Sequence, residues 1–409
     1  MKEQELIPQL FKTEYSKIIA VLCKLFGIMH IEIAEDITND TFLLASETWG
    51  LKGLPENPTA WLYTVAKNKT KDYFKRNKIF SEKISAEIKH SQQQFEEIDI
   101  DLSVKNINDS QLQMMFAICN PSIPKEAQIG LALRILCGFG IDEIAEAFLS
   151  NKETINKRLF RAKEKLRTEN IDIKLPNEAE ISKRLETVLT TIYLLFNEGY
   201  YSSTQNQNLR KELCIEAMRL NYFLLENEQT NLPITNALMS LMCFHSSRFE
   251  ARINETGEMV LYEDQDRNLW NDDLIAKGNQ YLIESAKGQE ISKYHLEASI
   301  AYWHSTKIEN SNKWENILQL YNQLLQIEYS PFTALNRTFA LSKVYGNEKA
   351  ISETEKLQLT NNRFYFSLLG HLYTDFDNKK AKYNYQKSVD LATTQRDKLL
   401  LQKKIDKLK

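Results

Sequence analysis

The sequence predicts an all-α protein, because helix-breaking residues are few and the apolar residues follow a helical period. Only 12 glycines and 8 prolines occur in 409 residues, and long stretches with apolar residues at helical spacing separate them. Hydrophobic residues make up 43% of the chain, which is enough for a sizeable core. A chain of this length exceeds what one core usually supports. We therefore expect several helical domains.

The first expected domain, residues 1–80, changes its charge halfway along. Residues 31–60 contain six acidic residues against one basic residue, and residues 61–80 contain six basic residues against one acidic residue. The first ten residues carry acids where a signal peptide would be basic, and no stretch approaches 18 uncharged apolar residues. We therefore expect a cytoplasmic protein with no membrane partner.

A linker is expected over residues 81–108. This stretch is polar, contains one aromatic residue, and includes an acidic run between Glu96 and Asp101. Such a composition cannot bury much apolar surface, so it predicts a flexible acidic connection.

The next expected domain, residues 109–170, contains a helix-turn-helix pattern. Residues 141–148 predict a short amphipathic helix, and residues 152–167 predict a second helix after a tight connection. The apolar stripe of the second helix follows steps of four, three and four residues: Ile155, Leu159, Ala162 and Leu166. A small alanine, Ala145, stands where the two helices would cross. In such a motif the second helix enters the major groove of DNA.

The second helix of this motif is strongly basic. Seven lysines and arginines against two glutamates lie between Lys152 and Arg167, in a chain whose formal net charge is -3. Polar residues at the start of such a helix can contact base edges or phosphates, and arginines offer paired donors to guanine or phosphate. The expected DNA contacts are Thr154, Asn156, Lys157, Arg158, Arg161 and Lys165. Alone, the pattern fits a solvated charged helix equally well.

Two stretches of the first domain resemble regions 2.2 to 2.4 of the extracytoplasmic-function (ECF) sigma factors. They read AEDITNDTFLLASETW (34–49) and PENPTAWLYTVAKNKTKDYFKRNK (55–78), with Asn39 where the family usually has glutamine. The helix-turn-helix is similar to region 4.2 of that family, with Leu149 in place of the usual glycine. Further stretches, from LLFNEGYYSS (194–203) to SPFTALNRTFAL (330–341), resemble the ECF group with a long helical C-terminal extension.

The resemblance implies a bacterial sigma factor, which is not an enzyme but helps core RNA polymerase to recognise a promoter and to start transcription. The β′ and β subunits of the polymerase and promoter DNA are the implied partners. The implied polymerase-binding residues are Glu35, Asp36, Asn39, Asp40, Phe42 and Leu43. The residues implied at the −10 element are Lys67, Asn68, Lys71, Lys75 and Arg76. The basic helix would contact the −35 element.

No pattern in the sequence predicts a catalytic site, a metal site or a cofactor. The six histidines lack the HExxH spacing, and neither a GxSxG stretch nor a glycine-rich phosphate loop occurs. The five cysteines are odd in number and never paired as CxxC, which predicts reduced, buried thiols. The related group usually has Cys-His-Pro before the helix-turn-helix, whereas this chain has Cys119-Asn120-Pro121.

The last expected domain is the extension, residues 171–409. Residues 362–392 echo the tetratricopeptide signature, with Leu369-Gly370, Tyr373, Ala381 and Tyr385 at nearly the expected spacing. This predicts a stacked-helix, tetratricopeptide-like domain. It would either mask the polymerase-binding face or brace the two DNA-binding domains, and we expect the brace. The sequence specifies neither its ligand or protein partner, nor the promoter, the inducing signal or the oligomeric state.

Two other functions fit parts of the sequence. A conventional helix-turn-helix regulator would bind DNA without polymerase, and it would need no acidic polymerase-binding helix. A helical-repeat scaffold would bind a protein, and it would need no basic helices.

Overall fold

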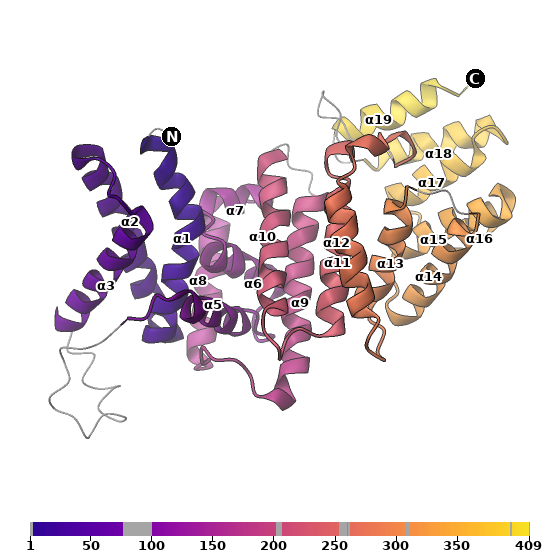
Figure 1. The fold of residues 1–409 in the computed structure, drawn as a ribbon. Helices are drawn as coiled ribbons and strands as arrows, with labels where there is room; N and C mark the ends of the chain where they lie inside the picture. Colours follow the sequence, from indigo (N-terminus) through magenta and orange to yellow (C-terminus); the bar gives the residue numbers. More distant parts are fainter. Residues whose placement is uncertain are drawn as a thin grey trace. The chain divides into compact units, whose positions relative to one another are not determined.

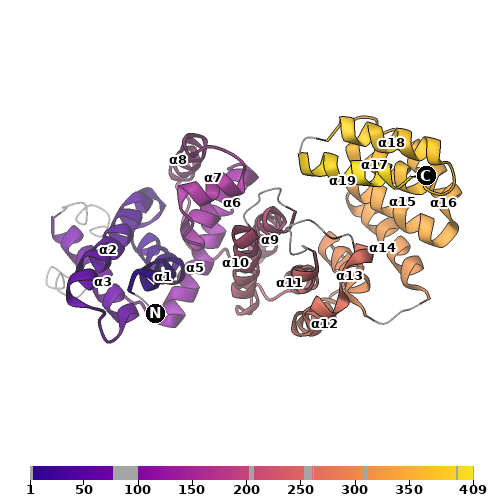
Figure 2. The same cartoon turned by 90° about the horizontal axis from the view of Figure 1, so that it is seen from above.

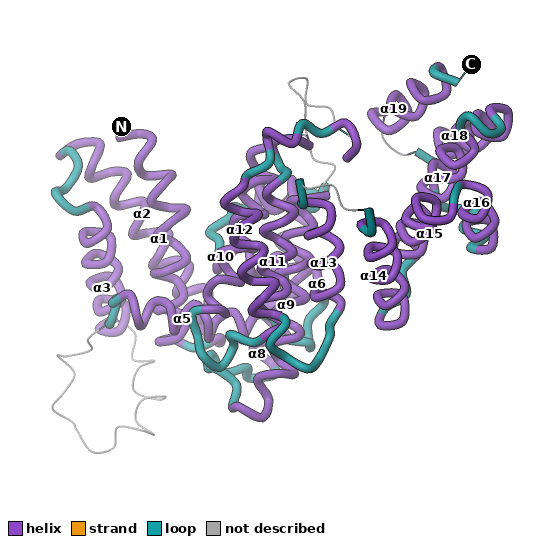
Figure 3. The backbone as a smooth tube through the Cα atoms, turned by 45° about the vertical axis from the view of Figure 1, so that its right-hand side comes forward, coloured by secondary structure: helices purple, strands orange, loops and turns teal. Residues whose placement is uncertain are grey.

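Helices form the framework of the chain in the computed structural model (Figure 3). The structure describes residues 3–76, 100–201, 207–252, 260, 262–307, 311–392 and 395–408. Within these ranges every regular element is helical and no strand occurs, which confirms the all-α prediction. The chain divides into two compact units, residues 1–231 and 232–409.

Unit 1 contains the helices from α1 to α10 (Figure 1). Their bounds are α1 (Glu3–Phe26), α2 (Ile31–Lys52), α3 (Pro58–Arg76), α5 (Val104–Ile118), α6 (Lys125–Leu131), α7 (Ile141–Ala147), α8 (Lys152–Thr168), α9 (Glu178–Tyr201) and α10 (Gln207–Leu225). Short helical turns, η1 (Ile28–His30) and η2 (Ala132–Leu136), join some of them. Most of the predicted linker, 81–108, lies outside the described residues, and its last five residues begin α5.

Helix α1 is the centre of unit 1. It contacts α2 and α3 on one side and α5 and η2 on the other. Apolar residues occupy all sides of its middle turns, so Ile18, Ile19 and Leu22 are fully buried. Gln111 of α5 donates a buried hydrogen bond to Ser16 of α1 at 3.2 Å. The expected region 2 helices, α1 to α3, and the expected region 4 helices, α5 to α8, therefore pack against each other in this structure.

The helix-turn-helix consists of α7 and α8. Leu149, which stands where the related family usually has glycine, lies in the connection between them. Leu149 adopts a positive φ of 48° in the turn, a conformation that glycine takes without steric cost. Asn151 then caps α8 by accepting a hydrogen bond from the backbone amide of Thr154 at 2.8 Å. The connection therefore has the tight backbone geometry that usually requires glycine, and the backbone of Leu149 is strained.

Helices α9 and α10 belong to unit 1, although the sequence assigns them to the extension. Arg184 of α9 donates a hydrogen bond to the carbonyl of Phe116 at the end of α5, and Arg219 of α10 donates one to the carbonyl of Leu136. Thr191 of α9 donates to the buried Gln128 side chain of α6 at 2.8 Å. The physical unit therefore ends about 60 residues after the expected start of the extension at residue 171.

Unit 2 contains the helices from α11 to α19, several of which pack as neighbouring pairs (Figure 2). Their bounds are α11 (Pro233–Ser247), α12 (Asp272–Ser285), α13 (Lys293–Ser305), α14 (Lys313–Ile327), α15 (Pro331–Tyr345), α16 (Asn347–Lys356), α17 (Arg363–Tyr373), α18 (Asn378–Asp390) and α19 (Gln395–Asp406). The residues that echo the tetratricopeptide signature fall on α17 and α18. A Cβ atom on Gly370 would lie 2.8 Å from the ring of Tyr385, so the glycine lets these two helices approach closely.

Candidate nucleic-acid interface and the acidic helix beside it

Helix α8 presents three faces, and the first of them is the predicted apolar stripe. Ile155, Leu159, Ala162 and Leu166 are all buried. They anchor α8 against α6 and α7, which it contacts. The prediction of a half-buried basic helix is confirmed.

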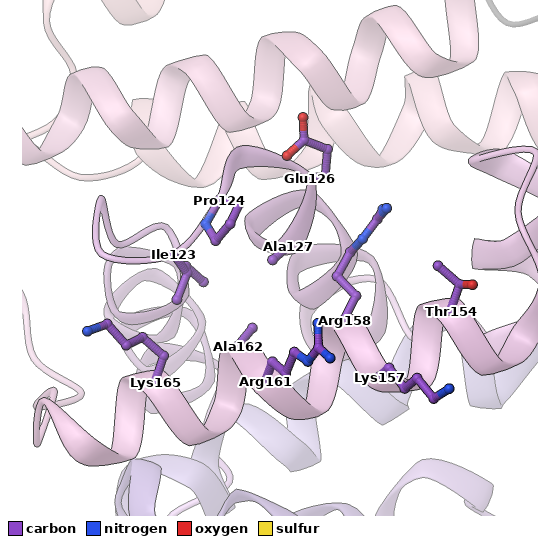
Figure 4. A pocket seen from close by; sticks show the side chains of 10 residues that line it. All are labelled: Ile123, Pro124, Glu126, Ala127, Thr154, Lys157, Arg158, Arg161, Ala162 and Lys165. Atoms are coloured by element: carbon purple, nitrogen blue, oxygen red, sulfur yellow. The ribbon is translucent and has the colours of Figure 1, made fainter.

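The second face of α8 borders a hollow of about 410 Å³ between this helix and the start of α6 (Figure 4). Five of the six residues expected to contact DNA line it, namely Thr154, Lys157, Arg158, Arg161 and Lys165. Ile123, Pro124, Ala127 and Ala162 supply apolar lining, and Glu126 of α6 is its one acidic residue. Figure 4 shows Thr154 and Lys165 at opposite ends, with Arg158 and Arg161 between them. The hollow is therefore a cationic surface suited to an anionic chain.

Arg158 differs from the other bases of this face in how it is held. Its guanidinium lies 5.5 Å from the ring centre of Phe148, at the end of α7, and the residue is half-buried. Lys157, Arg161 and Lys165 are exposed. A cation packed on an aromatic ring loses less freedom when it binds, so Arg158 is the most preorganised donor of the surface.

Two exposed residues of α8 lie outside the hollow. Asn156, an expected DNA contact, is exposed but does not line it. Phe160, one helical turn further along, exposes 62% of its surface. Sequence analysis missed Phe160. In the sequence, the feature that could have identified it is an aromatic residue that lies outside the apolar stripe of a basic helix.

The residues expected at the −10 element lie on α3. Asn68, Lys71, Lys75 and Arg76 are exposed, and Lys67 is half-buried. The opposite side of α3 packs Tyr73 and Phe74 against Phe26 of α1, with ring centres 5.6 and 5.0 Å apart. Trp61 packs on the buried Trp49, which supports a core role for it. The structure thus leaves a basic face of α3 open.

The residues expected to bind polymerase lie on α2 and separate into two sets. Asp36, Asn39, Asp40 and Leu43 are exposed. Leu43 exposes 57% of its surface, and Leu51, two turns further on the same side, exposes 87%. This exposed set forms one acidic and apolar face, which we call the α2 face. Asp40 pairs with Lys69 of α3 at 3.3 Å.

The other two expected polymerase contacts, Glu35 and Phe42, are buried. Phe42 packs on Phe11 of α1, with ring centres 4.9 Å apart. Neither side chain is available to a partner in this arrangement, because the apolar stripe of α2 includes Phe42 and because Glu35 is occupied by basic residues.

These basic residues come from the third face of α8 and from η2. Glu35 forms ion pairs with Lys163 of α8 and with Arg134 of η2, the latter at 3.5 Å. Arg167 of α8 pairs with Glu32. Burial lowers the pKa of the Arg167 guanidinium, and burial raises the pKa of the neighbouring Cys23 thiol. Two of the seven basic residues of α8 are therefore turned inward, which the sequence pattern did not distinguish.

No metal site appears among the residues that the structure describes. Within them, no three His, Cys, Asp or Glu side chains come together as ligands. All five cysteines are buried and unpaired, as predicted. Asn120 accepts a hydrogen bond from the backbone amide of Ser122 at 3.0 Å, and its carbonyl accepts one from Gln128. The Cys-Asn-Pro element therefore stabilises the turn before α6.

Comparison with known proteins adds two similarities. Residues 184–286, from α9 to α12, match a family of unknown function (DUF6596). An uncharacterized protein of Rhizobium meliloti (strain 1021) is 30% identical over 387 residues, which is 93% of this chain and 90% of the relative. No solved structure matches the chain. Among the described helices, none has the length and apolar character needed to cross a membrane.

Proposed function

This chain belongs to one family with its Rhizobium meliloti relative, and we propose that it is a sigma factor of the ECF type. In this proposal, α2 and α3 bind core RNA polymerase and the −10 element, and α8 binds the −35 element. The protein is not an enzyme, because the polymerase carries out the chemistry. The helices after α8 support these contacts.

One observation carries the proposal: a basic helix-turn-helix and an acidic helix occur in a single packed unit. The hollow beside α8 gathers four basic side chains over an apolar lining, which suits contact with phosphates and base edges. The α2 face combines exposed acids with exposed leucines, which suits a basic and partly apolar protein surface. A scaffold would need no such basic helix, and a conventional regulator would need no α2 face.

Run-off transcription with purified core polymerase and a library of random promoters tests the proposal. We expect transcripts only when this chain is present, and binding of the chain to the core enzyme in gel filtration. Specific DNA binding without polymerase binding would favour the conventional regulator instead. An absence of both activities would favour a scaffold.

Asp40→Arg is expected to weaken binding to core polymerase by about tenfold, because it places a like charge against a basic surface and breaks the pair with Lys69. The effect should shrink as salt is raised, since screening weakens exposed charges. Titration of labelled protein with core enzyme measures it. Glu228→Arg, the same change at an exposed position of a distant turn, serves as the control. Equal binding by both variants would show that the α2 face is not used.

Phe160→Ala is expected to lower selectivity at one thymine of the −35 element by about 1 kcal/mol, since an exposed ring on this helix can pack on the thymine methyl group. Binding to the same site with uracil in place of each thymine in turn locates the contact. The wild type should lose affinity at one position, and the variant should not. Identical profiles would remove Phe160 from the interface.

A further inference from the structure

We propose that unit 2 binds a phosphate group, free or carried by a small molecule, at a site built around Tyr262. Four side chains surround the ring of Tyr262 and hold the ligand: Arg248, Trp270, His304 and Lys313. They come from four different elements, so only the folded unit brings them together. The contacts proposed above for promoter DNA and polymerase do not use them.

Tyr262 begins the short turn η4 (Tyr262–Asp264) and lies at the centre of the site. The Arg248 guanidinium, at the end of α11, and the Lys313 ammonium, at the start of α14, each lie 5.3 Å from the centre of its ring. The ring of His304, near the end of α13, lies 4.9 Å away. The ring of Trp270, which follows η5 (Arg267–Leu269), lies 6.2 Å away. Helix α13 contacts both α11 and α14 (Figure 3). The four side chains are therefore within reach of one small ligand.

The cation at the start of α14 is not balanced by an acid. Lys313 is half-buried, donates a hydrogen bond to the Tyr262 hydroxyl at 2.9 Å, and forms no ion pair with any carboxylate of the described residues. Two acids close to Tyr262 in the sequence are engaged elsewhere, since Glu263 pairs with Lys343 at 2.9 Å and Asp266 caps η5. A partly buried cation without a counter-ion is costly, and a bound anion offsets that cost.

Two further nitrogen atoms at the site have no hydrogen-bond partner in the described part of the chain. Trp270 exposes 3% of its surface, and its buried indole Nε1–H can only donate. Nδ1 of His304 is the second of these atoms. Burial and the charges of Arg248 and Lys313 lower the pKa of His304 to about 3, so the imidazole is neutral at pH 7 and can carry a donor N–H on Nδ1. Buried polar atoms are normally hydrogen-bonded, so these two indicate that a group rich in acceptors binds here.

A phosphate group matches these donors in charge and in number of acceptors. Arg248 and Lys313 place two positive charges at Tyr262, and a phosphate monoester carries nearly two negative charges at pH 7. Its three terminal oxygens can accept from the ammonium, the indole and the imidazole, and guanidinium groups bind phosphate through paired hydrogen bonds. Tyr262, His304 and Lys313 are half-buried, so the ligand has access from solvent.

Isothermal titration of the full-length protein with inorganic phosphate and with ribose 5-phosphate tests the site. Lys313→Met is expected to weaken binding of both by about 10- to 150-fold, because a hydrogen bond from a charged donor is lost. Trp270→Phe removes the indole N–H and should weaken binding by about 2- to 10-fold. Tighter binding of ribose 5-phosphate would identify a phosphorylated small molecule as the ligand, and tighter binding of inorganic phosphate would identify the free ion.

Lys293→Met is the matched control. Lys293 is also half-buried and lies 5.6 Å from a tyrosine ring, but it pairs with Glu328 at 2.9 Å and lies at the opposite end of α13 from His304. This variant should bind both ligands as the wild type does. Equal binding by the wild type, Lys313→Met and Lys293→Met would overturn the site. Equal affinity for succinate, a dianion without phosphate, would overturn the choice of phosphate.

Thermal unfolding at equal ionic strength separates a ligand site from a structural role. Without ligand, Lys313→Met should unfold at the same temperature as the wild type or higher, because methionine keeps the apolar stem and removes an unbalanced charge. Ribose 5-phosphate at about 100 times its Kd should raise the unfolding temperature of the wild type but not of the variant. A lower unfolding temperature of the ligand-free variant would show that Lys313 is structural and would overturn the proposal. Neither measurement uses polymerase or promoter DNA, so the result is independent of the proposed function.

Discussion

A chain stopped after Lys174 is expected to lose the fold of unit 1, and a chain stopped after Asn231 is expected to keep it. The first truncation removes α9 and α10, which contact α5, α6 and α7. It deletes the charged donors Arg184 and Arg219 and leaves the carbonyls of Phe116 and Leu136 without them. Each hydrogen bond from a charged group is worth about 1.5–3 kcal/mol, and each large apolar side chain that loses its cover costs a similar amount.

A few such losses equal the roughly 5–15 kcal/mol that stabilises a whole domain. Urea unfolding followed by circular dichroism measures the effect. The longer chain should unfold cooperatively, while the shorter one should show no native baseline. Cooperative unfolding of both chains with similar midpoints would contradict the assignment of α9 and α10 to unit 1.

The chain stopped after Asn231 also decides the role of unit 2 in transcription. We expect it to bind core polymerase and to transcribe less than the full-length protein, because the extension is expected to support the sigma contacts. Higher output from the shorter chain would identify unit 2 as an inhibitor instead. Because the full-length protein and the chain stopped after Asn231 both contain the whole of unit 1, a difference in transcription between them reports on unit 2.

The second large effect is expected from Arg158. Arg158→Ala should weaken binding to the matched −35 element by about 5- to 150-fold, the loss of a paired contact to a base worth about 1–3 kcal/mol. Its position over Phe148 holds the guanidinium ready, so little ordering is needed on binding. Binding to a scrambled site should change little.

Arg161 provides the comparison, because it lines the same hollow but is exposed. Arg161→Ala should weaken matched and scrambled sites alike and should reduce the slope of log affinity against log salt by about one, as expected for a phosphate contact. Fluorescence anisotropy at several salt concentrations measures both variants beside Lys105→Ala, an exposed control on α5. An equal loss on both sites for Arg158→Ala would make it a phosphate contact as well. Wild-type binding by both variants would exclude α8 as the interface.

The sequence by itself determined the local features of this protein. Apolar spacing predicted the buried stripe of α8, because a helix must hide one side whatever it packs against. The two short helices of the helix-turn-helix followed in the same way, since each depends on residues near in the chain. The hollow itself was not predicted, but five of the six expected DNA contacts line it, because helical spacing placed them on one side of α8.

Only the tertiary structure decided which charges face water. Lys163 and Arg161 are both basic and lie two positions apart, yet the Lys163 side chain exposes only 11% of its surface beside Glu35, whereas Arg161 is exposed. The boundary of unit 1 likewise depends on contacts between α9 and helices 60 or more residues earlier, such as that of Arg184 with Phe116. The spacing of apolar residues predicts that one side of a helix is buried. It does not predict which element buries that side, because this depends on packing between segments that are distant in the sequence.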